Sequence, residues 1–501
     1  MRSFSIPLFM LFLVGCLMGQ TPQLSETYDI WIRGGMVLDG LGNPPIHADV
    51  LISQDTITFI GRNSEEYAAK DTIDAFGKVV TPGFIDPHAH GNPYQTPHFN
   101  NFTNMGVTTI SLGQDGSSPP NQNFNQAIEK TNRLALGPNI AFFIGHGTIR
   151  NLSGIKYKRN PSKEKIQQMS DILDRGMKAG AFGLTTGLEY IPGRYANQSE
   201  LDELAKVVGK YDGLIMSHMR TENDTTIESD LAELFSQGDY ANIHVSHMKV
   251  VYGKGSERAE DILQLLDQKR AQSSFIVSAD VYPYLASYTT IAILFPEYAL
   301  APNHYDTVRN NRRDDLLNYV KKKVNSRNGP EATLFGTQPY KGKTLKQIAD
   351  DMGIPFEEVL VDRFGPGGGL SAAYFTMDRD LQYRFLQDPH VMISSDGSPT
   401  MHHPRGHGSF AKVIEEFVVK DSLFTLEEAI RKMTSLPAQI IGIKDRGVLR
   451  QGFKADILIF DPTNIKANAT YVSPHKSATG FDHVLINGKV GAGHGIVLRK
   501  K

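Results

Sequence analysis

The chain has 501 residues, of which 40% are hydrophobic, so it can bury a large core and suits a barrel that carries an accessory domain. Its 52 basic and 54 acidic residues nearly cancel, and this balance gives no electrostatic reason to expect a nucleic-acid partner. A single cysteine, Cys16, excludes an internal disulfide.

The first residues have the form of a targeting segment. Arg2 precedes an apolar run at 4–14 that is too short to span a bilayer, so residues 1–20 are predicted to be a signal peptide. The run ending in Cys16 resembles a bacterial lipobox, in which that thiol would carry lipid and anchor the protein to a membrane. The alternative is an ordinary signal peptide cut near Gly19. Both predict a protein outside the cytoplasm, either periplasmic or membrane-anchored as a lipoprotein.

Short alternating strands with turn signals occupy both ends of the chain. They cover residues 27–81 on the N-terminal side and residues 441–501 on the C-terminal side. Neither half has enough strands to be stable alone. The two halves are therefore predicted to form one small composite β domain.

Between these ends, residues 82–440 alternate apolar β-type runs with helical patterns, which is typical of parallel strands joined by crossover helices. Eight such runs predict the α/β class and a (β/α)8, TIM-like barrel. An excursion at about 285–343 interrupts the barrel before its last strand. It is interpreted as a lid, and the alternative is a surface excursion without a catalytic part. The runs are the strand before His88, then 107–112, 139–145, 181–187, 214–219, 242–248, 274–284 and 391–396.

Polar residues follow the predicted strands at the edge where such a barrel has its active site. His88 and His90 end the first strand, and residues two apart in an extended segment face one point, where two imidazoles can bind a divalent metal. For a lone His-x-His the alternative is a solvated loop. Further ligand types at other strand ends disfavour that alternative. They are Asp115, Glu189, His218, His247 and Asp396.

These motifs resemble the N-acyl-D-amino-acid deacylase (D-aminoacylase) family of the amidohydrolase superfamily. The resemblance covers about residues 28–490. A late motif at 452–457 is shared by the wider superfamily and is less specific. The runs that carry the resemblance are Gly145–Arg150, Thr186–Gly193, Ser246–Lys249, Asp280–Tyr284 and His403–Gly406.

The resemblance implies a metal-dependent hydrolase of the amidohydrolase barrel type. It implies that His88 and His90 hold one metal, that His218 and His247 hold another, and that Asp396 contacts the metal-bound water as general base. The implied cofactor is zinc, as one or two ions, with manganese as an alternative. The chemistry agrees, because a divalent metal activates water and polarises an amide carbonyl while a carboxylate transfers the proton.

The resemblance also places Lys249, Tyr282 and Arg405 around the carboxylate of the substrate. A cation, a phenol and a guanidinium are groups that would fix a carboxylate. The alternative for each is a surface cation or a packed ring. Arg220 and His146 are predicted to face the same rim, with no assigned role.

One residue departs from the family pattern. Many members have a cysteine metal ligand after the second strand, and this chain has Asp115 there. A carboxylate is predicted to replace the thiolate, either Asp115 or Glu189, which follows the fourth strand where related barrels have a bridging ligand. Oxygen in place of sulfur makes a harder site that suits manganese or binds zinc less tightly.

The predicted function is metal-dependent hydrolysis of N-acyl-D-amino acids, or of small D-residue peptides, to a carboxylate and a free D-amino acid. The substrate is a small molecule. One alternative is a cyclic-amide hydrolase of the hydantoinase or dihydroorotase kind. The other is an envelope lipoprotein that binds without turnover. The D-side chain, the acyl group, the number of metals and the oligomeric state are left open.

Overall fold

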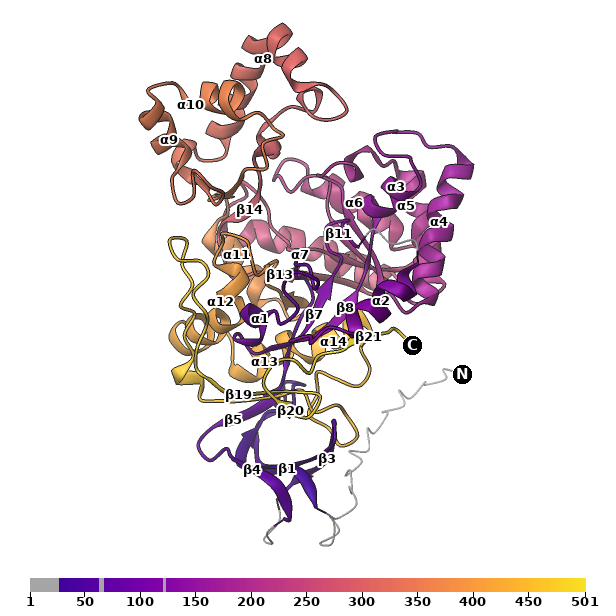
Figure 1. Ribbon diagram of the computed structural model, residues 1–501, viewed down its shortest axis with the longest axis vertical. Coiled ribbons are helices and arrows are strands. Elements are labelled where there is room, and N and C mark those ends of the chain that lie inside the picture. The colour runs from indigo at the N-terminus through magenta and orange to yellow at the C-terminus, as the bar shows by residue number, and fades with distance from the viewer. Residues whose placement is uncertain (1–26, 63–66, 120–122) are drawn as a thin grey trace, which may run out of the picture.

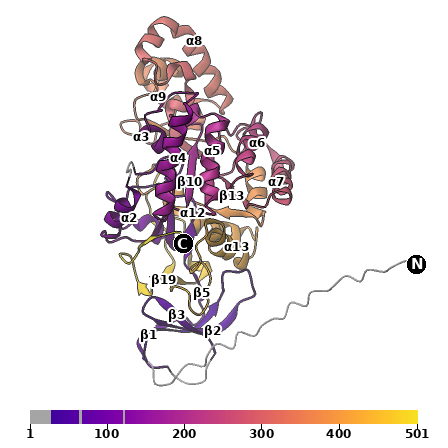
Figure 2. The same ribbon diagram turned by 90° about the vertical axis from the view of Figure 1, so that its right-hand side faces the viewer.

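The computed structural model describes residues 27–62, 67–119 and 123–501, so the predicted signal peptide and Cys16 lie outside these ranges and stay predictions. Three parts follow one another along the long axis (Figure 1, Figure 2). A β domain lies at one end, a barrel in the middle, and an insertion that contains α8 (Tyr305–Ser326) at the other end. Within the described ranges, no helix has the length and apolar character needed to cross a bilayer.

The β domain is one sheet built from both ends of the chain. Its order is β20-β19-β18-β5-β1-β2-β3, with β4 paired to β1. β18 runs antiparallel to β5, and Ile459 lies opposite Val80 in its fully buried core. The prediction of a composite β domain is confirmed. The strands are β1 (Tyr28–Val37), β2 (Ile46–Ser53), β3 (Thr56–Gly61), β4 (Ala69–Asp74), β5 (Val79–Pro82), β18 (Ile457–Phe460), β19 (Phe481–Ile486) and β20 (Lys489–Val490).

The barrel strands form a parallel ring, which confirms the predicted fold class. β6, β7 and β8 form one sheet, and β9, β10, β11, β12, β13 and β17 form another. β8 and β9 are separated only by Phe143, and a bridge between Ala89 and Gly397 joins the first strand to the last. The strands are β6 (Phe84–Asp86), β7 (Val107–Leu112), β8 (Asn139–Phe142), β9 (Ile144–Gly145), β10 (Gly183–Gly187), β11 (Leu214–His218), β12 (Asn242–Val245), β13 (Val277–Val281) and β17 (Val391–Ile393). β13 is shorter than the predicted run at 274–284.

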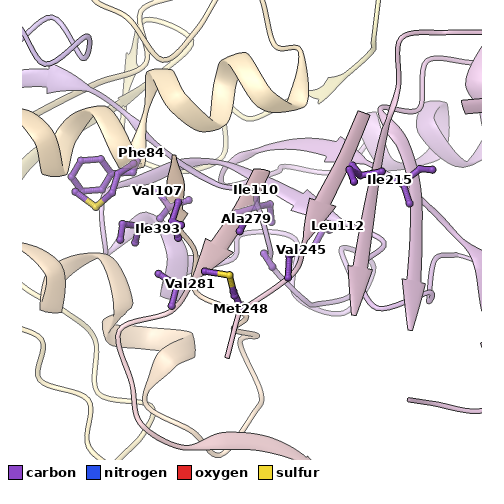
Figure 3. Packing of buried hydrophobic residues seen from close by; sticks show 14 of the residues in the cluster. Phe84, Val107, Ile110, Leu112, Ile215, Val245, Met248, Ala279, Val281 and Ile393 are labelled. Carbon is purple, nitrogen blue, oxygen red and sulfur yellow. The ribbon is translucent and has the colours of Figure 1, made fainter. Parts of the chain in front are cut away.

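Helices cover the outside of the ring, and the apolar spacing in each explains why. In α4 (Lys163–Lys178), Met169, Leu173 and Met177 recur every four residues and are buried, which gives the helix one apolar face toward the strands. Figure 3 shows part of this core, to which several barrel strands contribute apolar side chains, including Ile110 of β7, Val245 of β12 and Ile393 of β17. The other helices are α1 (Asn100–Thr103), α2 (Phe124–Asn132), α3 (His146–Leu152), α5 (Gln198–Gly209), α6 (Ile227–Gln237), α7 (Gly255–Gln272), α11 (Arg379–Gln387), α12 (Arg405–Lys412), which continues as a π-helix (Val413–Lys420), α13 (Leu426–Met433) and α14 (Ser435–Ile441).

The insertion between β13 and β17 has a hydrophobic core of its own. Phe335, Leu360 and Tyr374 are fully buried in it. Its antiparallel sheet has the order β14-β16-β15, and because β16 pairs with both other strands the insertion reaches Tyr374, well beyond the predicted end at 343. Its further elements are β14 (Ser287–Thr290), β15 (Thr333–Phe335), β16 (Ser371–Tyr374), α9 (Leu345–Met352), α10 (Phe356–Glu358) and a π-helix (Val359–Phe364).

The last strand departs from the predicted domain boundary. β21 (Val497–Leu498) pairs in parallel with β8, with Val497 opposite Ile140. The prediction that 441–501 belong wholly to the β domain is therefore wrong for these residues. The reason is geometric. β8 and β9 together form the third barrel strand, and β10 pairs only with β9, from Ile144 onward. The edge of β8 is therefore free on that side, and β21 occupies it.

Candidate metal centre

The first group of candidate ligands gathers at the carboxyl ends of β6, β7 and β17. It consists of His88, His90, Asp115 and Asp396, whose ligand atoms lie within 4.8 Å of one another. The Asp115 oxygens lie 3.3 Å from His88 Nε2 and 3.4 Å from His90 Nε2. Asp396 Oδ1 lies 3.1 Å from His90 Nε2. Two imidazoles and two carboxylates form a donor set that suits zinc or manganese.

Asp115 also belongs to a second group, with His218 at the end of β11 and His247 after β12. His218 Nδ1 lies 2.9 Å from His247 Nε2, and Asp115 Oδ1 lies 3.4 Å from the same His247 nitrogen. Glu189, after β10, has its Oε2 atom 3.2 Å from His218 Nε2. The structure therefore brings all seven predicted ligands together, and the Asp115 carboxylate lies between the two histidine pairs.

Three residues of this centre have left-handed backbone conformations. The φ angle is 51° at Asp115, 36° at His247 and 47° at Asp396. Non-glycine residues adopt such angles at a cost of about 1–3 kcal/mol each, and they persist where the surrounding structure demands them. Each lies just after a barrel strand, where a sharp turn directs its side chain over the mouth of the barrel.

Buried polar atoms in the centre lack partners that a cation would supply. His88 Nε2 and Asp115 Oδ1 are buried, and neither has a hydrogen-bond partner within the described part of the chain. Buried polar atoms normally do have partners, so a missing one calls for an explanation. A divalent cation between these atoms provides one.

The charges of the centre also favour a cation. Burial and Lys249 oppose protonation of His247, but the carboxylates of Glu222 and Asp115 outweigh them and raise its pKa to about 9. Burial opposes ionisation of Asp115, yet the neighbouring His88 and His247 hold its pKa well below its usual range. The carboxylates thus stay charged and attract positive charge, which a metal can deliver in exchange for protons.

Beside the candidate metal ligands lies a group of side chains that suits a carboxylate. Arg405 Nη1 is 2.8 Å from Asp396 Oδ2, and its guanidinium lies over the Tyr282 ring at 4.8 Å from the centroid. The Lys249 ammonium lies 5.8 Å from the same centroid. All three side chains are buried, so the alternative of a surface cation does not hold for either charge.

Curated relatives identify the family. An N-acyl-D-glutamate deacylase from Alcaligenes xylosoxydans xylosoxydans is 33% identical over 93% of this chain and 94% of its own length. A D-aminoacylase from the same organism is 30% identical with the same coverage of both chains. The chain belongs to the N-acyl-D-amino-acid deacylase family. A model described as the amidohydrolase family also matches residues 373–491.

Solved structures of this deacylase family have the same fold. The structure of N-acyl-D-glutamate deacylase from Bordetella bronchiseptica, complexed with zinc and a phosphonate inhibitor, is 30% identical, with a TM-score of 0.82 over 95% of this chain and 100% of that chain. A D-aminoacylase structure is 29% identical, with a TM-score of 0.80 over 94% of this chain and all of that one. An L-hydantoinase from Arthrobacter aurescens, 15% identical with a TM-score of 0.57 over 94% of this chain and 100% of that chain, shares the fold.

Sequence reasoning missed Asp280 as part of the centre. This buried carboxylate accepts hydrogen bonds from His244 Nε2 at 2.6 Å and from the backbone N–H of His247 at 3.0 Å, and it lies 3.7 Å from His88 Nδ1. Burial opposes its ionisation, but its hydrogen bond with His244 and the nearby His88 ring hold its pKa well below the usual range. A buried carboxylate behind a metal-binding imidazole orients the ring and makes it a better ligand.

Sequence reasoning also missed Glu222. Its Oε1 atom lies 2.6 Å from Lys249 Nζ and 3.1 Å from His247 Nδ1. This carboxylate fixes both a predicted metal ligand and a predicted substrate-binding cation. Its position four residues after His218, in the same loop at a strand end, is the signal that was available in the sequence.

His146 and Arg220, which the sequence placed at the rim, both pair with carboxylates of the fold. His146 was predicted to face the rim, but it is fully buried and its Nε2 lies 2.7 Å from Glu200, which also pairs with Arg150. That prediction is wrong, because His146 begins α3 and its buried ring contacts Glu200 on α5. Arg220 forms an ion pair with Glu233 at 2.7 Å and lines a hollow beside the centre.

The centre opens into a cavity of about 240 Å³. Candidate ligands form its base, and residues of the insertion, including Tyr288 and Arg327, line it as well. Two adjoining hollows of about 430 and 320 Å³ share Glu189 or Asp115 with it. The site is therefore enclosed jointly by the barrel and the insertion.

Proposed function

We propose that this protein hydrolyses the amide bond of N-acyl-D-amino acids and releases a carboxylate and a free D-amino acid. One observation carries this proposal. Asp396 lies between two groups with different chemistry, since one of its oxygens is 3.1 Å from a candidate ligand, His90, and the other is 2.8 Å from Arg405. A linear substrate with an amide next to a carboxylate matches that arrangement.

The cofactor in this proposal is zinc, as one or two ions, with manganese as an alternative. His88, His90, Asp115 and Asp396 would hold one ion, and His218 and His247 would hold the other with Asp115 or Glu189. The unpartnered atoms of His88 and Asp115 fit this assignment. When bound, the metal would polarise the amide carbonyl and lower the pKa of a water molecule.

Asp396 is the proposed acid–base residue. Burial opposes its ionisation, but Arg405 and His247 outweigh burial and hold its pKa well below its usual range, so it is charged and able to accept a proton. It would take the proton from the attacking water and return it to the leaving nitrogen. This transfer makes the departing group a neutral amine.

Lys249, Tyr282 and Arg405 are the proposed binding groups for the substrate carboxylate. A guanidinium with two parallel donors suits a carboxylate better than it suits one oxygen of Asp396. When the substrate draws Arg405 toward its own carboxylate, Asp396 loses part of the positive charge that stabilises its ionised form. Its basicity therefore rises at the moment when the amide is in place.

The cyclic-amide alternative receives less support. A cyclic amide such as a hydantoin needs no clamp of two buried cations and a phenol beside the base. The hydantoinase structures are only 15–16% identical to this chain. A linear N-acyl amino acid would use the candidate metal centre through its amide, and the group of Lys249, Tyr282 and Arg405 through its carboxylate.

The proposal is tested by measuring amine release from N-acetyl D- and L-amino acids with purified protein lacking residues 1–20. We expect cleavage of D-substrates only, lost on chelation and restored by zinc or manganese. Hydantoin and dihydroorotate serve as controls for cyclic amides. Failure to cleave either enantiomer while metal is bound would contradict the proposal and favour a binding protein.

Substitution of Arg405 tests the carboxylate clamp. We expect Arg405→Met to raise KM for an N-acetyl-D-amino acid by about 100-fold, because a buried ionic contact with the substrate is lost. Arg405→Lys keeps the charge but not the two parallel donors, and we expect a smaller rise. Circular dichroism verifies the fold of each variant. An unchanged KM in both variants would exclude a clamp that contains Arg405.

A further inference from the structure

Arg327 is a buried cation that has no anionic partner among the residues that the structure describes. It directly follows α8 in the insertion, is 3% exposed, and lines the active-site cavity together with Glu189 and His218. Its Nε atom has no hydrogen-bond partner, and among the described residues no carboxylate forms an ion pair with its guanidinium. Burial of an unpaired charge is costly, so such a residue calls for a reason.

The fold holds Arg327 in place. Its guanidinium lies over the buried Tyr374 ring at 4.8 Å from the centroid, a contact that orients the group without neutralising it. Its backbone N–H donates to Val324 at 2.9 Å, and the next residue, Asn328, donates from its side chain to the Phe375 carbonyl at 2.8 Å. The donors of Arg327 are thus positioned before any ligand arrives.

The surroundings add positive charge. Lys323 lies one turn earlier on α8 and lines the adjoining hollow, as does Arg194 from the barrel rim. Burial and the neighbouring cations Arg327 and Arg194 lower the pKa of Lys323, and they outweigh the opposing effect of the Glu189 carboxylate. Glu189 is a nearby carboxylate, but its Oε2 atom faces His218. The wall that the insertion contributes therefore attracts an anion.

We propose that Arg327 binds a second carboxylate of the substrate, in addition to the one held by Lys249, Tyr282 and Arg405. This inference rests on the proposed deacylase function and narrows its substrate to dicarboxylic N-acyl-D-amino acids. The second carboxylate belongs either to an acidic D-side chain, aspartate or glutamate, or to a dicarboxylic acyl group such as succinyl. Both present the same planar anion, which Arg327 can hold with two parallel hydrogen bonds.

The experiment compares three substrates on the metal-loaded protein. N-acetyl-D-glutamate carries the second carboxylate on the side chain, N-succinyl-D-leucine carries it on the acyl group, and N-acetyl-D-leucine lacks it. We expect Arg327→Met to lower kcat/KM about 10- to 100-fold for one of the first two substrates, the loss of one charge-assisted contact, and to leave N-acetyl-D-leucine within about threefold. The substrate that responds identifies the source of the carboxylate.

A matched control and a second readout keep the test decisive. Lys322→Met removes an exposed cation of the same helix and should leave all three rates unchanged. Arg327→Met should also raise the melting temperature, because an unpaired buried charge is replaced by an apolar chain of similar length. Equal effects on all three substrates would overturn the inference and make Arg327 a counter-charge for Glu189. If wild-type protein cleaved none of them, the deacylase proposal itself would fail.

Discussion

Asp396→Asn is expected to lower kcat by about a thousandfold or more while the protein stays folded. The amide keeps the size of the carboxylate and its contact with Arg405, but it cannot accept a proton, and general acid–base catalysis contributes about 10²- to 10⁴-fold. Amine release from the best D-substrate gives kcat, and elemental analysis gives the metal content. We expect the KM to change much less than kcat.

The metal content separates the two roles proposed for Asp396. If the variant retains its metal and loses activity, Asp396 acts as the base. If metal is lost in parallel with activity, Asp396 is chiefly a ligand and the base lies elsewhere. Asp261→Asn serves as the control, since this residue on α7 has 65% of its side chain exposed and should tolerate the same change.

Asp115→Ala is expected to lose at least one bound metal equivalent and to lower activity by about 100-fold or more. The Asp115 oxygens lie within 3.4 Å of His88, His90 and His247, so removal of the carboxylate leaves both groups incomplete. Loss even of an outer partner of a metal site costs about 10- to 100-fold, and a direct ligand costs at least as much. Elemental analysis and activity at a series of metal concentrations measure both effects.

Two further variants sharpen this test. Asp115→Cys supplies a thiolate, and we expect it to retain metal and to favour zinc over manganese more strongly than the wild type does. Glu189→Ala is expected to reduce metal binding only in the second group, which contains His218 and His247. Full metal content in both Asp115→Ala and Glu189→Ala would contradict the idea that a carboxylate takes the place of the cysteine ligand.

The site residues that could be predicted from the sequence are those that directly follow a barrel strand. His88 and His90 come directly after an apolar β-type run, and His218 and His247 follow in the same way. Because parallel strands of a barrel end at one rim, such residues meet whatever the distance between them in the sequence. This rule predicts that the candidate ligands, including Asp396, lie close together.

The residues behind the ligands could not be predicted in the same way. Asp280 was visible in a motif, but its role depends on His244 and His88, which approach it only once the strands are packed. The predicted end of the insertion, at about residue 343, is wrong for a related reason. β16 is only four residues long, and its pairing with β14 and β15 depends on contacts that no local pattern records.

Among the described residues, the hydrophobic core of the insertion is separate from that of the barrel. In the proposed function, the candidate metal centre and the first carboxylate clamp belong to the barrel, while the second carboxylate contact of Arg327 belongs to the separately packed insertion. A substitution inside the core that contains Phe335 and Leu360 can shift the wall that carries Arg327 without repacking the strands that carry the candidate metal ligands. If the proposed function holds, substitutions in the insertion would change which acyl amino acids are accepted and leave the candidate metal centre unchanged.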